Sequence, residues 1–125
     1  MTRAEFDLRF CAEARSWVGV AFCHNGRTRS QGVDCLGLLL LVYGALGFET
    51  PEGAKTCAYR ADWYSHTIDS ELLRQFLNLG IEVDLAALKV GDILYFAPGR
   101  LFPQRSDLVT HSGLYVGAGA FVHAI

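Results

Sequence analysis

Near the start of the chain, apolar residues recur every three or four positions, which places them on one face of a helix. The segment Thr2-Arg3-Ala4-Glu5 precedes this stripe as a capping box, in which a hydroxyl and a carboxylate satisfy free amides at the helix start. The pattern predicts a helix from Arg3 to Val18 that stops at Gly19. The members of the apolar stripe are Phe6, Phe10, Ala14 and Trp17.

A second helix is predicted from an almost continuous apolar run. Asp34 is its expected N-cap, the run extends from Leu36 to Leu46, and Gly47 provides a C-terminal stop. Because this helix is apolar nearly all round, we expect it to be buried centrally. The run is shorter than the roughly 20 residues that a transmembrane helix needs, so no membrane insertion is expected. Residues 19–33, rich in Gly, Arg and Ser, are predicted to form a loop.

The middle of the chain carries weaker signals. Residues 48–66 show no periodicity and are predicted to be irregular. A third helix is expected from Ser70 to Leu79, with Asp69 as its cap and Gly80 as its stop.

The last third of the chain changes from helical to strand-like patterning. The short apolar run Ile93–Phe96 predicts a buried strand, and a loop is expected over residues 98–109. His111–Val116 and Ala120–Ala124 are predicted as two further strands joined by a turn at residues 117–119. Helices followed by an antiparallel meander indicate an α+β fold.

Composition narrows the class of protein. The 125 residues suit a single domain covering residues 1–125, and 51% of them are hydrophobic, which is enough for a core. The net charge of −2 disfavours nucleic acid as the main partner. The N-terminus lacks the apolar core of a signal peptide, so cytoplasmic synthesis is expected. The 4 cysteines form no C-x-x-C pair, so neither a metal site nor a cofactor is predicted, and Cys11 is expected to be a small buried hydrophobe.

Cys35 stands in the first turn of the central helix, directly after its cap. Unpaired amides at a helix start carry partial positive charge, which stabilises a thiolate and can lower a cysteine pKa. The same amides can donate to a developing oxyanion, and Gly37 leaves room near the sulfur. On this pattern alone, a nucleophile and a buried structural cysteine are equally good interpretations.

A thiolate needs a positioned base. His111 opens a predicted strand and is followed by small residues, while His123 lies near the end of the next strand. If these strands pair across their tight turn, the two imidazoles lie close together, and one can orient the other.

Several segments, in order along the chain, resemble the motifs of the NlpC-type cell-wall peptidases, a papain-like family of bacterial cysteine endopeptidases. Asp34-Cys35-Leu36-Gly37-Leu38 resembles the nucleophile motif Asp-Cys-Ser-Gly-Leu, and the segment His111–Gly117 resembles the base motif His-Val-Gly-Ile-Tyr-x-Gly. Leu88–Phe96 resembles the strand lead-in, Phe121–Ala124 the third-position motif, and Trp17–Asn25 the approach loop.

This resemblance implies a papain-like fold, with the nucleophile on a central helix packed against a small antiparallel sheet. It implies that Cys35 is the nucleophile, His111 the general base and His123 the orienting residue. The implied substrate is the stem peptide of bacterial peptidoglycan, cut between D-glutamate and a diamino acid. The residues expected to bind substrate beside this set are Asp34, Phe22 and Ser112.

The segment Tyr59–Trp63 resembles a branch of the family found in phage tails and gene transfer agents. This implies phage-like tail proteins as partners. A tail-borne enzyme would act at the cell wall or in the periplasm after delivery by the particle, which fits a chain without a signal peptide.

The chain departs from the family pattern in three places. Phe22 stands where a tyrosine hydroxyl usually assists the oxyanion site, and Leu36 replaces the serine after the nucleophile. The chain also ends at Ile125, where the family normally adds strands. The early end favours either a truncated copy or an exposed sheet edge completed by a partner, including a second copy of the chain.

Two alternative functions stand beside peptidoglycan hydrolysis. The first is a non-catalytic tail or wall-binding component that keeps the fold, favoured by Phe22 and the early end. The second is thiol acyl transfer or amidase chemistry at the same site, which would need an acceptor or a substrate of a different kind.

Overall fold

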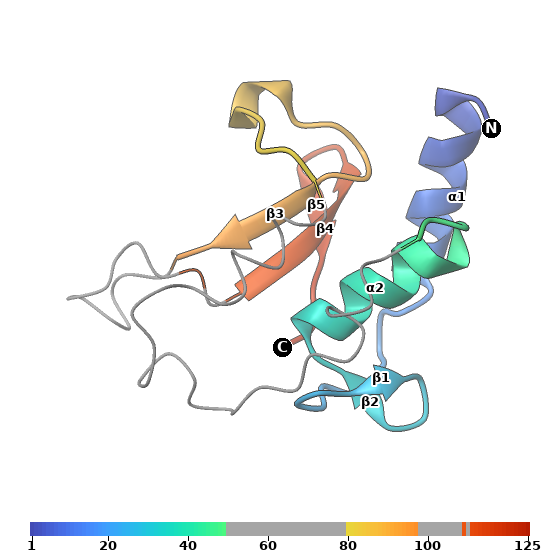
Figure 1. Cartoon of the computed structure of the whole chain (residues 1–125), viewed down its shortest axis with the longest axis vertical. Coiled ribbons are helices and arrows are strands. Elements are labelled where there is room, and N and C mark those ends of the chain that lie inside the picture. Colours follow the sequence, from blue (N-terminus) through green and yellow to red (C-terminus); the bar gives the residue numbers. More distant parts are fainter. Residues whose placement is uncertain (50–79, 98–108, 110) are drawn as a thin grey trace.

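The computed structural model of the chain describes residues 1–49, 80–97, 109 and 111–125 (Figure 1). The predicted helix at 70–79, most of the predicted irregular stretch at 48–66 and nearly all of the loop at 98–109 lie outside these residues. Within them, two helices, a small hairpin and a separate antiparallel sheet confirm the predicted α+β class.

Helix α1 (Arg3–Arg15) begins at the predicted capping box. Thr2 Oγ1 accepts the Glu5 amide at 3.1 Å, and the Glu5 carboxylate accepts the Thr2 amide at 3.1 Å. The helix ends three residues before Val18, the end predicted from the sequence. The Ser16 hydroxyl donates to the Glu13 carbonyl at 2.6 Å, and the following residues tighten into a turn, which takes the backbone out of the α-helical path.

The stretch predicted as a loop before the second helix contains a short hairpin. Strands β1 (Arg27–Thr28) and β2 (Gly32–Val33) pair in antiparallel fashion, with Thr28 opposite Gly32. Two-residue strands leave almost no hydrophobic alternation in a sequence, so periodicity could not reveal them. The hairpin lies below the start of α2 in Figure 1 and leads directly into it.

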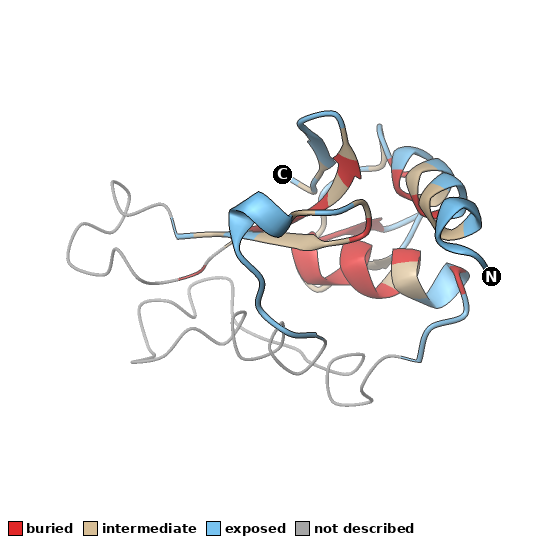
Figure 2. Ribbon diagram, turned by 90° about the horizontal axis from the view of Figure 1, so that it is seen from above, coloured by how far each residue is buried: buried red, intermediate tan, exposed pale blue. Residues whose placement is uncertain are grey.

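Helix α2 (Cys35–Ala45) confirms the predicted central helix, with Asp34 as its N-cap and Leu46 as its C-cap. Gly47 follows in the left-handed conformation at φ 91°, which ends the helix. Every residue of this helix from Cys35 to Leu40 is buried, as the red helical turns in Figure 2 show. The apolar composition of the helix is therefore explained by its position in the core.

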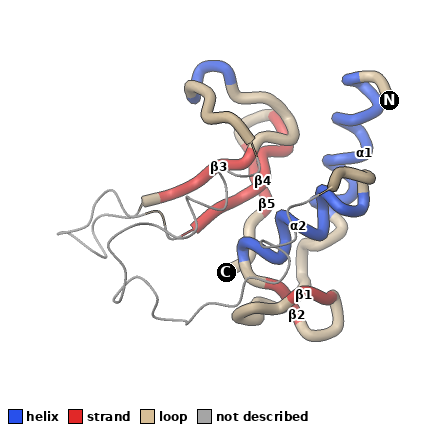
Figure 3. Tube along the Cα trace, viewed as in Figure 1, coloured by secondary structure: helices blue, strands red, loops and turns tan. Residues whose placement is uncertain are grey.

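The main sheet has the order β3-β4-β5 in the described residues and is antiparallel throughout. Strand β3 (Ile93–Phe96) pairs with β4 (His111–Gly117), and Phe96 lies opposite His111. Strand β5 (Ala120–Val122) pairs with the other side of β4, with Leu114 opposite Val122. A short 3-10 helix, η2 (Leu85–Ala87), precedes β3, and a tan loop connects the two in Figure 3.

The core forms where α1 and α2 pack against one face of β4. Alternation along a strand places Ser112, Leu114 and Val116 on that face, and all three are buried. Cys11 packs at the edge of this core, and its thiol donates to the Val116 carbonyl at 3.3 Å. In the described part of the chain, no helix has the length and apolar character needed to cross a membrane.

Candidate active site

Asp34 fixes the start of α2 through three contacts. One carboxylate oxygen accepts the Gly37 amide at 2.7 Å and the Arg27 guanidinium at 2.8 Å, while the other accepts the Asn25 amide at 2.9 Å. The Asp34 side chain is 1% exposed. It therefore ties the helix start, the hairpin and the loop before the hairpin into one unit, which sets the position of Cys35 next to it.

Gly37 allows close packing at the start of α2. A Cβ atom at this position would lie 2.3 Å from the Gly26 carbonyl oxygen. The glycine therefore lets the loop before the hairpin approach the first turn of α2. The structure thus gives Gly37 a packing role, and the room near the sulfur expected from the sequence stays a prediction.

Cys35 is buried at the interface between α2 and β4, with 7% of its surface exposed. The backbone amide and the side chain of Ser112 interact with its sulfur, as does the Leu36 amide. Ser112 is 1% exposed, and its Oγ atom has no well-formed hydrogen bond to a described residue. An unpaired buried hydroxyl costs about 1–3 kcal/mol, so it calls for an explanation.

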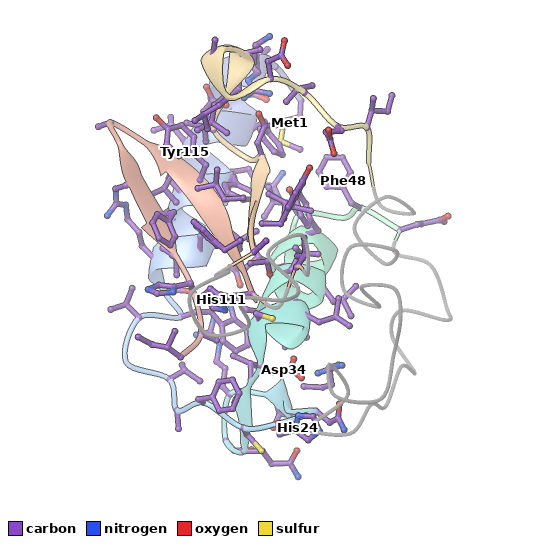
Figure 4. The ribbon with its side chains drawn as sticks, turned by 90° about the vertical axis from the view of Figure 1, so that its left-hand side faces the viewer. Met1, His24, Asp34, Phe48, His111 and Tyr115 are labelled. Atoms are coloured by element: carbon purple, nitrogen blue, oxygen red, sulfur yellow. The ribbon has the colours of Figure 1, made fainter. Side chains whose placement is uncertain are left out.

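The two predicted histidines meet at the end of the sheet. His111 Nε2 and His123 Nδ1 lie 2.8 Å apart, which is a hydrogen bond between the rings. Figure 4 shows His111 beside the N-terminal end of α2, with Asp34 at the start of that helix. Ser112, which directly follows His111 in β4, contacts Cys35, so the proposed base lies one position along the strand from a residue that touches the sulfur.

Phenylalanines from the neighbouring strands hold the two imidazoles. Phe96 stacks on His111 with ring centroids 5.8 Å apart, and Phe121 lies 4.9 Å from His123. A Cβ atom at Gly113 would lie 2.6 Å from the Phe121 ring, so the glycine makes room for it. Sequence reasoning did not assign either phenylalanine to the site, although the pairing of Phe96 with His111 follows from the strand register.

The electrostatics of Cys35 differ from the sequence-based expectation. Burial raises the pKa of its thiol above the ordinary value, contacts of the sulfur with Ser112 and with the Leu36 amide act in the opposite direction, and the Asp34 charge raises this pKa further. The predicted lowering of the thiol pKa by the helix start is therefore wrong for the resting site. Loss of hydration outweighs the partial charge of the first-turn amides.

The pKa of His111 is also shifted, and the shift is downward, which keeps the imidazole unprotonated and able to act as a base. Burial lowers the pKa of its imidazole below 6.5, and the charge of His123 lowers this pKa further. At neutral pH the site consequently holds a protonated thiol and a neutral imidazole rather than an ion pair.

The three residues predicted to bind substrate occupy different environments. Phe22 is 51% exposed, and its backbone bridges to Val33, two positions before Cys35. Asp34 and Ser112 are covered, which favours a supporting role over direct contact with a substrate. The partner of Asp34, Arg27, was missed because a pair formed through the fold leaves no local pattern.

Replacing Asp34 by alanine is expected to lower the free energy of unfolding by about 3 kcal/mol, because the helix cap and the partner of Arg27 disappear together. Denaturant titration monitored by circular dichroism measures this. Asp7→Ala is the matched control, since it removes a partner of Arg3 in an exposed pair and should cost about 0.5 kcal/mol. Equal losses in the two variants would contradict the anchoring role of Asp34.

Comparison with known protein families places the site in context. The model of the NlpC/P60 family matches residues 19–125, which is most of the chain. The chain belongs to the NlpC/P60 family. The match in this NlpC/P60 chain includes the approach segment at Phe22, Cys35 with its cap, and both histidines.

A related NlpC/P60-like sequence is the gamma-DL-glutamyl hydrolase of Bacillus subtilis (strain 168). It is 30% identical over 122 residues, which cover 97% of this chain and 24% of the relative. The chain thus spans about a quarter of the length of that protein. Among the described residues, no three His, Cys, Asp or Glu side chains gather in an arrangement that could hold a metal ion.

Proposed function

We propose that this NlpC/P60 chain is a cysteine hydrolase that cleaves the stem peptide of bacterial peptidoglycan. Cys35 is its nucleophile, His111 its general base and His123 the residue that orients the base. The observation that carries this proposal is the 2.8 Å contact between the two imidazoles at the end of β4, where the next residue contacts the buried sulfur.

The imidazole contact assigns the protons in the proposed mechanism. The Nε2 atom of His111 is hydrogen-bonded to His123. The other ring nitrogen, Nδ1, is therefore the atom that can accept the thiol proton. A base that accepts a proton at Nδ1 carries its own proton on Nε2 and donates it to His123 Nδ1. His123 then accepts at Nδ1 and carries its own proton on Nε2.

Catalysis then proceeds by acyl transfer to sulfur. His111 Nδ1 takes the thiol proton while the sulfur attacks the peptide carbonyl carbon, and the tetrahedral intermediate carries its negative charge on oxygen. His111 returns the proton to the leaving amine, which leaves a thioester on Cys35. Water, deprotonated by His111, cleaves the thioester and releases the new carboxylate together with the free thiol.

The start of α2 supplies donors for the oxyanion. Cys35 and Leu36 occupy the first positions of the helix, where amides have no acceptor within the helix. These amides can donate hydrogen bonds to the oxyanion in place of the hydroxyl that a tyrosine at position 22 would supply. Phe22 instead offers an exposed apolar surface to the substrate.

The nature of the substrate bond rests on the relative's name and on the motif resemblance. A gamma-DL-glutamyl hydrolase supports a γ-linked glutamyl bond as the point of cleavage. We therefore infer that the scissile bond joins the γ-carboxyl of D-glutamate to a diamino acid. Delivery by a phage-like tail stays a prediction, and Tyr59–Trp63, on which it rests, lies outside the described residues.

The proposal is tested with synthetic stem peptides and mass spectrometry of the products. We expect the γ-linked D-glutamyl peptide to be cleaved to a free γ-carboxylate and an amine, and its α-linked isomer, which has the same mass, to remain intact. Binding to peptidoglycan without cleavage would favour the non-catalytic alternative. A product joined to an added amine rather than to water would favour acyl transfer.

The pH dependence of kcat/KM should reveal the state of His111. Its imidazole must be unprotonated to act as a base, so the acid limb is expected below pH 6.5, because burial and His123 both lower its pKa. His123→Gln removes one of these causes and keeps a hydrogen-bond acceptor, so its acid limb should move up toward 6.5. A downward movement would show that His123 does not repel the charged base.

A further inference from the structure

Ser112 presents a hydroxyl to the sulfur from the opposite side of the interface to the helix. The residue lies in β4, directly after His111, on the face that packs against α2. It is 1% exposed, and its Oγ atom makes no well-formed hydrogen bond to a described residue. Its side chain and its backbone amide both interact with Cys35.

The resting thiol explains why this hydroxyl is unsatisfied. A thiol sulfur is a weak acceptor, whereas a thiolate is a charged one that draws donors strongly. A hydroxyl held beside the sulfur therefore gains its partner only when Cys35 loses its proton. Such a donor favours the reacting state over the resting state, which is the condition for a contribution to rate.

The helix gives Cys35 no hydroxyl of its own. Leu36, the next residue, is fully buried and apolar, and Asp34 on the other side carries negative charge. Stabilisation of the thiolate by a side chain consequently has to come from the sheet. Ser112 is the polar side chain of β4 that is placed to give it.

We propose that Ser112 is a further functional residue of this site, whose buried hydroxyl lies against the resting thiol without a well-formed hydrogen bond to a described residue and donates to the Cys35 thiolate during the reaction. This inference rests on the proposed role of Cys35 as nucleophile. Ser112 was predicted from the sequence to bind substrate; in this proposal it binds the sulfur of the nucleophile instead.

The test is the rate of Cys35 alkylation by iodoacetamide as a function of pH, with labelled peptides identified by mass spectrometry. In Ser112→Ala we expect the pH of half-maximal labelling to rise by about one unit, which is about tenfold slower labelling at a fixed lower pH. Labelling of Cys11 and Cys23 in the same samples should not change. Ser112→Thr keeps the hydroxyl, so its labelling profile should lie close to that of the parent.

The melting temperature separates this role from a structural one. Removing a buried hydroxyl without a partner should leave the melting temperature of Ser112→Ala unchanged or raise it. An unchanged labelling profile in Ser112→Ala would overturn the proposal. A shifted profile that comes with a lower melting temperature and no rescue by threonine would overturn it as well, since the hydroxyl would then be structural.

The same experiment distinguishes failure of this inference from failure of the proposed function. His111→Ala, measured in parallel, reports whether His111 assists Cys35 at all, whereas the difference between Ser112→Ala and the parent reports only on the hydroxyl. The charged and titratable groups of the site are unaltered in the serine variants: Asp34, whose charge acts on the sulfur, its partner Arg27, and His111 and His123 at the end of the sheet.

Discussion

Hydrolysis of the γ-glutamyl stem peptide is expected to fall by about 10⁴-fold or more when Cys35 is replaced by alanine. The proposed reaction forms a covalent bond to this sulfur, which alanine lacks. Initial rates measured by chromatography of the released amine give kcat/KM for the parent and the variant. Circular dichroism should show the same helix and sheet signals in both.

Cys23 provides the matched control for this loss. It is partly buried in the loop before the hairpin, and its sulfur lies 3.7 Å from the carbonyl oxygen of His24. Cys23→Ala should retain parental hydrolysis within about twofold, because surface-loop changes outside the site are usually small. If Cys35→Ala stays as active as Cys23→Ala, the chain is not a cysteine hydrolase.

Replacing His111 by glycine is expected to lower kcat/KM by about 10³–10⁴-fold, since both the removal of the thiol proton and its return to the leaving amine are lost. We expect a large loss because the pKa of the Cys35 thiol is raised. Without a base, only a small fraction of the enzyme then holds the thiolate at neutral pH. Rates in the variant should rise steeply with pH as the thiol ionises.

Free imidazole gives a direct check on the role of His111. The glycine variant leaves a space beside the ring of Phe96, and imidazole at high concentration should recover part of the lost rate. The double variant His111→Gly/Cys35→Ala should be no slower than Cys35→Ala alone, because the two residues act as a unit. Additive losses would show that His111 works through something other than Cys35.

The sequence predicted the elements that are set by local pattern. The capping box at Thr2 and the apolar stripe identify α1, and the apolar run behind Asp34 identifies α2. The meander was predictable because each strand is bounded by turn residues. The contact of His111 with His123 followed from pairing across a tight turn, without knowledge of the rest of the fold.

Features that depend on distant parts of the chain could not be predicted. The raised pKa of the Cys35 thiol comes from burial under β4, which lies far from it in sequence. Arg27 reaches Asp34 through the fold of a hairpin too short to leave a pattern. The contact of Ser112 with the sulfur needs the helix and the sheet to be docked, so its role emerges only in three dimensions.

The alternation of side chains along β4 limits how this protein can evolve. His111 and Gly113 serve the imidazole side of the strand, whereas Ser112 and Leu114 serve the helix side. Inserting or deleting a single residue within the strand would exchange these two sets, which would place an imidazole in the core and a leucine beside the second histidine. Length variation among descendants of this chain is therefore expected in its connecting segments, while the residue count of β4 is inherited unchanged.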